Sequence, residues 1–177
     1  MSAGDRERLE RLFRGNSGDV LAFLARRTAV REDAADLLAE VFLVAWRRID
    51  SVPAGDAGRL WLFGVARRVL ANHLRAARAQ TGLAEQLAAE LRTASVPAPD
   101  ELGQVVREEL ARLSRADREV LTLSYWEGFT PAEIGRIVGR PAATIRVRIH
   151  RARRRLERCL AARRMSTAQA LEAMRAV

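Results

Sequence analysis

Residues 115–160 read RADREVLTLSYWEGFTPAEIGRIVGRPAATIRVRIHRARRRLERCL, and this stretch decides the fold of the C-terminal part of the chain. The segment Thr130–Glu133 has the pattern of a helix start, with Thr as the N-cap, Pro at the first helical position and Glu at the third. Gly139 then marks the end of a short helix, and a second helix follows. Two short helices joined by a tight turn predict a helix-turn-helix, whose second helix fits the major groove of DNA.

The second helix of this pair has an apolar face and a basic face. Its apolar residues recur at helical spacing and are predicted to face the core: Ile145, Ile149, Ala152 and Leu156. The opposite face and its flanks hold Ala143, Val147, His150, Arg151 and Arg154, then Arg146, Arg148, Arg153, Arg155 and Arg158. Residues 140–158 contain eight arginines and one acid. A helix face that only contacts solvent does not need so high a density of positive charge. This density is typical of a surface that binds the phosphates of a nucleic acid.

Composition indicates a helical, anion-binding protein without a chemical active site. The 177 residues are 49% hydrophobic and have a net charge of +9, and every basic residue is Arg. The one cysteine, Cys159, excludes an intramolecular disulfide, and two His with scattered carboxylates form no nucleophile–base or metal constellation. We therefore predict no catalytic residue, no metal and no cofactor. The start of the chain is charged from Asp5 onward, and no uncharged apolar run reaches membrane-spanning length, so a cytoplasmic protein without membrane insertion is expected.

The expected architecture is all-α, with two small helical domains joined by a flexible linker. The domains are predicted over residues 1–79 and 103–160, and no strand pattern occurs. The linker, 80–102, contains a Pro-bearing stretch and lies in an acidic segment between two basic ones. Residues 161–177 are expected to form a tail with at most a short helix.

In the N-terminal domain, two short helices are predicted over Asp5–Phe13 and Gly18–Thr28, with a break at 16–17. A third helix, from Asp33 to Arg48, has a strong apolar stripe and further apolar residues outside it, a pattern typical of a helix that is buried or meets a partner. The stripe comprises Ala34, Leu37, Leu38, Val41, Phe42, Ala45, Trp46 and Ile49. After a loop over Ser51–Gly58, a long helix follows.

Three stretches together resemble bacterial RNA polymerase sigma factors of the extracytoplasmic-function (ECF) group. They are DAADLLAEVFLVAWRRID from Asp33, WLFGVARRVLANHLR from Trp61, and LARLSRADREVLTLSYWEGFTPAEIGRIVGRPAATIRVRIHRARRRL from Leu110. With their flanking helices they cover roughly residues 6–79 and 103–160. The resemblance implies a transcription initiation factor that binds core RNA polymerase and directs it to specific promoters.

The resemblance also implies a role for each surface. Docking on the clamp of the largest polymerase subunit is implied for Asp36, Glu40, Phe42 and Leu43. Capture of the melted, downstream (minus-ten) promoter element is implied for Arg59, Trp61, Arg67, Arg68, Asn72 and Arg75. Reading of the upstream (minus-thirty-five) element is implied for Arg140, Ala143, Thr144, Arg146, Val147, His150, Arg151 and Arg154. The polymerase flap and an anti-sigma factor are the further partners that it implies, and the protein would associate with the nucleoid.

The chain departs from the family pattern at several positions, which are Ala39, Val41, Val44, Gly58, Asn72 and Val147, and the departures at Gly58 and Val147 change the expected DNA contacts. Gly58 stands in the loop before Trp61 where the family usually has an aromatic residue, so no base-stacking role is expected for this loop. Val147 replaces a common Ser on the DNA-facing side of the second helix, and an apolar side chain there predicts contact with a thymine methyl group.

Two other functions compete with this interpretation. A helix-turn-helix regulator that acts without polymerase would share the C-terminal half, but it has no need of the helix over Asp33–Arg48 followed by WLFGVARR. An enzyme is poorly supported, because the sequence has no recognisable catalytic constellation.

Overall fold

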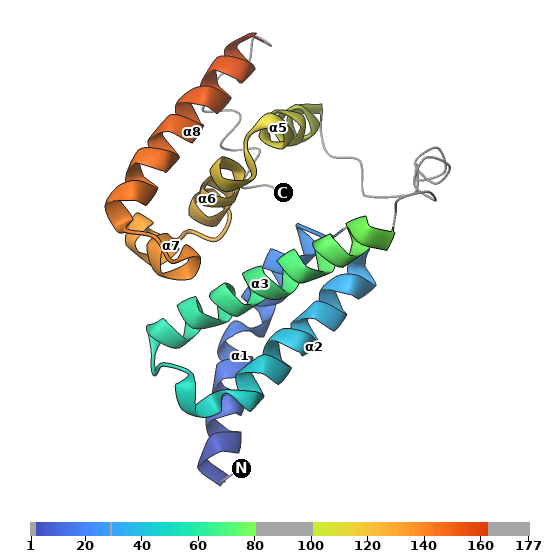
Figure 1. Cartoon of the computed structure of the whole chain (residues 1–177), viewed down its shortest axis with the longest axis vertical. Helices are drawn as coiled ribbons and strands as arrows, with labels where there is room; N and C mark the ends of the chain where they lie inside the picture. Colours follow the sequence, from blue (N-terminus) through green and yellow to red (C-terminus); the bar gives the residue numbers. More distant parts are fainter. Residues whose placement is uncertain (1–2, 29, 81–100, 163–177) are drawn as a thin grey trace. The chain divides into compact units, whose positions relative to one another are not determined.

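The computed structural model describes residues 3–28, 30–80 and 101–162, and within these residues every regular element is a helix (Figure 1). The chain divides into two compact units, Met1–Glu90 and Leu91–Val177. The expected all-α fold with two helical domains is thus confirmed. Most of the predicted linker and almost all of the predicted tail lie outside the described residues.

The first unit is a group of three long helices with one turn of 3-10 helix. The helices pack pairwise against one another. Their bounds are α1 (Ala3–Ala25), α2 (Arg31–Arg47), η1 (Ile49–Ser51) and α3 (Asp56–Gln80). The rings of Phe23 and Phe63 meet edge to face at the centre of this unit, with centroids 5.4 Å apart. Both rings are buried, as are Val20, Leu24 and Leu62, so the three helices share one apolar core.

Helix α1 corrects the prediction of two short helices. It runs without a break through Asn16, whose side-chain amide donates to the carbonyl of Leu12 at 2.8 Å instead of capping a new helix. Beyond this position, Val20 and Leu24 are fully buried against the other helices. Burial of these side chains outweighs the local preference of Gly and Asn for a helix end, because tertiary packing supplies most of the stability of a helix in a protein.

Helix α2 buries most of its predicted stripe. Ala34, Leu37, Val41 and Ala45 are all buried. Trp46 was predicted to belong to the same stripe, but its side chain is 50% exposed, which corrects that prediction. It follows Ala45 directly and is therefore rotated by about 100° from it around the helix axis, beyond the edge of the buried face. A large exposed aromatic side chain consequently lies at the end of α2.

The second unit consists of four helices in which α8 packs against each of the other three (Figure 1). Their bounds are α5 (Glu101–Arg112), α6 (Arg115–Tyr125), α7 (Pro131–Val138) and α8 (Ala142–Ala162). The buried core of this unit comprises Val106, Leu110, Leu113, Leu121, Ala152, Leu156 and Leu160. The predicted inward face of α8 is therefore confirmed, with Ile145 also buried and Ile149 half-buried.

Local interactions fix the start and the end of α7. The hydroxyl of Thr130 accepts from the backbone N–H of Glu133 at 3.3 Å, and the carboxylate of Glu133 accepts from the backbone N–H of Thr130 at 2.7 Å. This is the predicted capping box. Gly139 ends the helix in the left-handed region, with φ at 70°. Gly135 lies so close to the following turn that a Cβ atom there would be 2.6 Å from the carbonyl oxygen of Arg140, and this contact sets how closely α7 approaches the start of α8.

Candidate nucleic-acid interface

The predicted upstream-reading residues all lie on one exposed side of the helix-turn-helix. We call this set the recognition face: Arg140, Ala143, Thr144, Arg146, Val147, His150, Arg151 and Arg154, each exposed. The opposite side of α8 faces the core, so the apolar periodicity of the helix determines which side meets solvent. Side chains of this kind on a protruding helix can enter a major groove and reach base edges.

An open groove of about 910 Å³ runs along α8. It is lined by six of the eight residues of the recognition face, together with Asp117, Arg148, Arg155 and Arg158. Five arginines and one carboxylate therefore surround it, and the net charge of its walls is positive. A phosphate backbone is the ligand class that such a wall attracts.

The arginines of α8 divide into paired and unpaired groups. Arg153 donates to Glu157 at 2.8 Å, and this hydrogen bond is the main reason that the pKa of Arg153 is raised. Arg148 and Arg155 pair with Asp117. Within residues 101–162, by contrast, no ion pair involves Arg146, Arg151 or Arg154. Three of the unpaired arginines on α8 belong to the recognition face, and a fourth, Arg158, lies further along the groove and donates to the carbonyl of Arg154.

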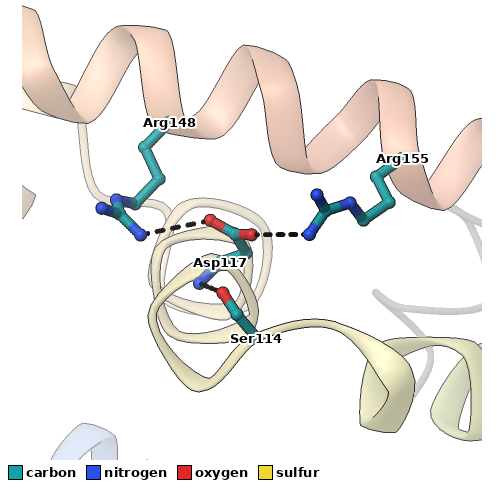
Figure 2. A network of polar contacts seen from close by, with 4 residues as sticks. All are labelled: Ser114, Asp117, Arg148 and Arg155. Carbon is teal, nitrogen blue, oxygen red and sulfur yellow. Dashed lines mark hydrogen bonds and ion pairs between the residues drawn. The ribbon is translucent and has the colours of Figure 1, made fainter.

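Figure 2 shows the pairing of Asp117 with the two arginines, and we call Asp117, Arg148 and Arg155 the charged triad. One carboxylate oxygen accepts from Arg148 at 3.3 Å and the other accepts from Arg155 at 3.4 Å. The backbone N–H of Asp117 donates to the hydroxyl of Ser114 at 3.2 Å, which caps α6. The partners of the Asp117 carboxylate lie 31 and 38 residues away along the chain, so no local sequence pattern predicts them.

The predicted downstream-element residues are only partly brought together. A pocket of about 350 Å³ between α2 and α3 is lined by Trp61, Arg68 and Asn72, and also by Arg47 and Arg48. The last two were absent from the predicted set, although they stand at the end of the stretch that carries the family resemblance. The lining also includes three valines and one acid, Glu40. With an aromatic side chain, an amide and three guanidinium groups against a single carboxylate, the pocket suits a base and its phosphate.

The other three predicted downstream residues do not line this pocket. Arg59 forms an ion pair with Asp19 on α1 at 3.1 Å, and its guanidinium also lies over the ring of Phe63. Arg75 is exposed and donates to the side chain of Asn72 at 2.5 Å, and Arg67 is half-buried. Arg59 thus ties α3 to α1, a structural role that the sequence did not reveal.

The structure explains why Gly58 stands where the family has an aromatic residue. Gly58 is buried in the first turn of α3, and a Cβ atom there would be 2.7 Å from the carbonyl oxygen of Pro53. The side chains of Leu12 and Val52 close the remaining space. No larger side chain fits this position without displacing the loop.

The predicted polymerase-docking residues separate into exposed and buried ones. Asp36, Glu40 and Leu43 are exposed on α2. Phe42 is a correction to the predicted contact surface, because it is only 8% exposed and its ring meets that of Phe13 edge to face, with centroids 4.8 Å apart. The reason is its position in the apolar stripe, where burial in the domain core competes with partner contact. Phe42 therefore lies beneath the exposed side of α2 and packs against α1.

The described ranges 3–28, 30–80 and 101–162 contain no group of three or more His, Cys, Asp or Glu that could hold a metal ion. None of the helices there is both long enough and apolar enough to cross a bilayer.

Comparison with known proteins connects these surfaces to a family. Residues 12–80 match the family described as Sigma-70 region 2, and residues 103–156 match Sigma-70, region 4. The ECF RNA polymerase sigma factor SigC of Mycobacterium tuberculosis is 30% identical over 162 residues, which cover 85% of this chain and 82% of the relative. The chain belongs to the ECF group of RNA polymerase sigma factors. As a sigma factor, it is a transcription initiation factor that directs RNA polymerase to promoters.

Other relatives of this sigma factor agree with that assignment. SigL of M. tuberculosis is 28% identical over 165 residues, covering 88% of this chain and 90% of the relative. Among solved structures, the sigma factor RpoE of Bartonella quintana, in complex with the anti-sigma factor NepR, is 26% identical with a TM-score of 0.60, covering 85% of this chain and 95% of that one. CnrH, in complex with the cytosolic domain of CnrY, is 25% identical with a TM-score of 0.58, covering 89% and 97%.

Proposed function

We propose that the recognition face of α8 reads the upstream, minus-thirty-five promoter element. The observation that carries this proposal is the partition of the arginines: Arg146, Arg151 and Arg154 are exposed without ion pairs among residues 101–162, on the same face as Val147. Guanidinium groups recognise guanine edges and phosphates, and an apolar side chain recognises a thymine methyl. The proposal further assigns polymerase and minus-ten binding to residues 1–79, and minus-thirty-five binding to residues 103–160.

Replacing Val147 with serine is expected to change one position of the preferred upstream sequence. Val147 lines the α8 groove, and its loss removes an apolar contact with a thymine methyl group worth about 1 kcal/mol, or roughly a fivefold preference. Selection from a randomised promoter library by run-off transcription measures the change. Val30→Ser is the matched control, because this exposed valine lies in the other unit. An unchanged preferred sequence for the Val147 variant would rule out the methyl contact.

The pocket between α2 and α3 is proposed to capture a base of the melted minus-ten element. Trp61 supplies a surface for stacking, while Arg47, Arg48 and Arg68 supply positive charge for the backbone. Since Gly58 leaves no room for an aromatic side chain in the preceding loop, Trp61 is the stacking residue of choice in this region. Asn72 provides a hydrogen-bonding amide beside it.

Core polymerase is proposed to dock on the exposed face of α2 through its clamp, and on the second unit through its flap. Replacing Leu43 with aspartate is expected to weaken core binding by about tenfold or more, because a buried leucine contributes about 1.5–3 kcal/mol at an interface. The side chain is 52% exposed, so the unbound chain should keep its stability.

Titration of labelled chain with core polymerase measures this change in affinity. Val30→Asp is the control, since it introduces the same charge at a valine that is 49% exposed, before the start of α2. Equal affinities for the Leu43 variant and the unaltered chain would place the docking surface elsewhere.

Run-off transcription with core polymerase on a genomic promoter library tests the whole proposal. Purified chain is expected to bind core at micromolar concentration and to select a subset of promoters with a common upstream element. Binding to promoter fragments without core, and no effect on run-off products, would favour the helix-turn-helix regulator instead. If the purified chain bound neither core polymerase nor DNA, both functions would be contradicted.

An anti-sigma factor is proposed as an inhibitor, since the solved relative RpoE is in complex with one. The chain is proposed to act in the cytoplasm at the nucleoid, where polymerase and promoter DNA meet. It is also proposed to have no catalytic activity of its own, because all the chemistry of initiation belongs to polymerase.

A further inference from the structure

One carboxylate lies in the wall of the basic groove along α8. It belongs to Asp117, and the other charged side chains of that wall are arginines. An acid placed beside a phosphate-binding surface weakens attraction to every DNA sequence. Its presence in the charged triad therefore needs a physical reason.

The local geometry places Asp117 between two arginines. Asp117 occupies the first turn of α6, where Ser114 accepts from its backbone N–H. Its carboxylate meets Arg148 with one oxygen and Arg155 with the other (Figure 2). The two arginines are seven residues apart, about 10.5 Å along α8. A single side chain on a neighbouring helix thus contacts two guanidinium groups that are about two turns apart on α8.

The charged triad contributes little to holding α8 against α6. Its contacts of 3.3 and 3.4 Å are longer than the distances of about 2.7–2.9 Å in strong charge-assisted hydrogen bonds. Arg148 and Arg155 are 41% and 55% exposed, so solvent screens the attraction. Leu121 of α6 and Leu156 of α8 are already joined in the buried core. The helices consequently keep their packing with or without this carboxylate.

We propose that Asp117 is a positioning residue that raises the sequence selectivity of α8 by holding Arg148 and Arg155 away from indiscriminate phosphate contacts. This inference rests on the proposed reading of upstream DNA by the recognition face. Phosphate contacts carry no sequence information, and each one strengthens binding to all DNA. Arg148 and Arg155 must give up their pairs with Asp117 before they contact a phosphate, so they add less to that background than free arginines would. The unpaired arginines of the recognition face remain available for the bases of the correct site.

The test is the salt dependence of DNA binding by the holoenzyme formed with core polymerase. Two duplexes serve as probes: a promoter obtained from the run-off selection, and the same fragment with its upstream element scrambled. Asp117→Asn is expected to steepen the slope of log K against log salt by about one to two units on the scrambled duplex, since each new phosphate contact adds about 0.9. The ratio of the two affinities is expected to fall several-fold.

A matched control distinguishes two effects of Asp117→Asn: the release of Arg148 and Arg155 from their ion pairs, and the loss of one negative charge. Glu157→Gln also removes one negative charge from a partner of an arginine on α8, but neither Glu157 nor Arg153 lines the groove. Its effect on the slope is expected to be less than half that of Asp117→Asn. Equal effects of the two variants would overturn the proposal, as would an unchanged slope and an unchanged affinity ratio for Asp117→Asn.

A second pair of variants tests the proposal without altering Asp117, and it decides alone if Asp117→Asn fails to fold. Arg154→Gln removes an unpaired arginine and is expected to make the slope shallower by about one unit. Arg155→Gln removes its neighbour in the triad and is expected to leave the slope unchanged. Equal slopes for these two variants would show that Arg155 contacts phosphate freely, and would overturn the proposal.

Failure of this inference is distinguishable from failure of the proposed function. Holoenzyme that does not distinguish the selected promoter from its scrambled form contradicts upstream reading itself. Holoenzyme that distinguishes them equally well with and without the Asp117 carboxylate contradicts only the role of Asp117.

Discussion

Replacing both Arg146 and Arg151 with alanine is expected to abolish selection of the upstream promoter element while leaving polymerase binding intact. Both side chains are exposed on the recognition face and have no ion-pair partner within residues 101–162. Loss of a guanidinium that contacts a base or phosphate costs about 1–3 kcal/mol, so the double variant should lose about 2–6 kcal/mol of upstream binding. Stability should change little, because neither arginine packs in the core.

Two measurements check this expectation: promoter selection in run-off transcription, and affinity for core polymerase measured separately. Arg153→Ala is the control, since Arg153 is a basic residue of the same helix that pairs with Glu157 outside the groove. It should preserve selection. Promoter selection that survives in the double variant would place the DNA-reading surface elsewhere than on α8. Equal losses in the double variant and in Arg153→Ala would indicate a general effect of charge.

Replacing Gly135 with alanine is expected to destabilise the helix-turn-helix by about 1–3 kcal/mol, the usual cost of forcing an extra group into a packed site. The added Cβ atom would lie 2.6 Å from the carbonyl oxygen of Arg140. Because that oxygen belongs to the backbone, the turn between α7 and α8 must open to relieve the contact. The start of α8, with Ala143 and Thr144 of the recognition face, would move with it.

Thermal unfolding followed by circular dichroism measures the effect of this substitution. A loss of 1 kcal/mol lowers the Tm of a domain of this size by about 4–8 °C. Gly18→Ala is a control of opposite sign: Gly18 lies within α1 with no atom within 4 Å of an added Cβ, so alanine should stabilise the first unit by about 0.5–1 kcal/mol. An unchanged unfolding transition for the second unit of the Gly135 variant would contradict the close approach seen at the turn.

Patterns of short range allowed much of the fold and of the upstream interface to be predicted. The capping box at Thr130 and the helix end at Gly139 depend on residues within four positions of each other, and both occur as expected. The apolar period of α8 likewise determines its buried side, so exposure of Val147 and Arg151 follows from the sequence. Local chemistry and helical geometry are sufficient in these cases.

Interactions between distant helices could not be predicted in this way. Asn16 is a residue type that favours a helix end, but α1 continues through it. Packing of α1 against α2 and α3 outweighs this local preference. Phe42 and Trp46 belong to one apolar stripe in the sequence, yet the first is buried and the second exposed. The ion pairs of Asp117 and Arg59 join residues more than 30 positions apart, so no periodic pattern reveals them.

The two units bury separate sets of apolar side chains, one around Phe63 and one around Leu156. A substitution on the outer side of α8 therefore leaves the packing that supports the α2 surface untouched. Over evolutionary time, substitutions in the second unit can therefore give such a chain a new set of target genes. The first unit can stay unchanged meanwhile, because the polymerase that it binds does not change. Duplicated copies of one ancestral gene could diverge into distinct regulons by this route.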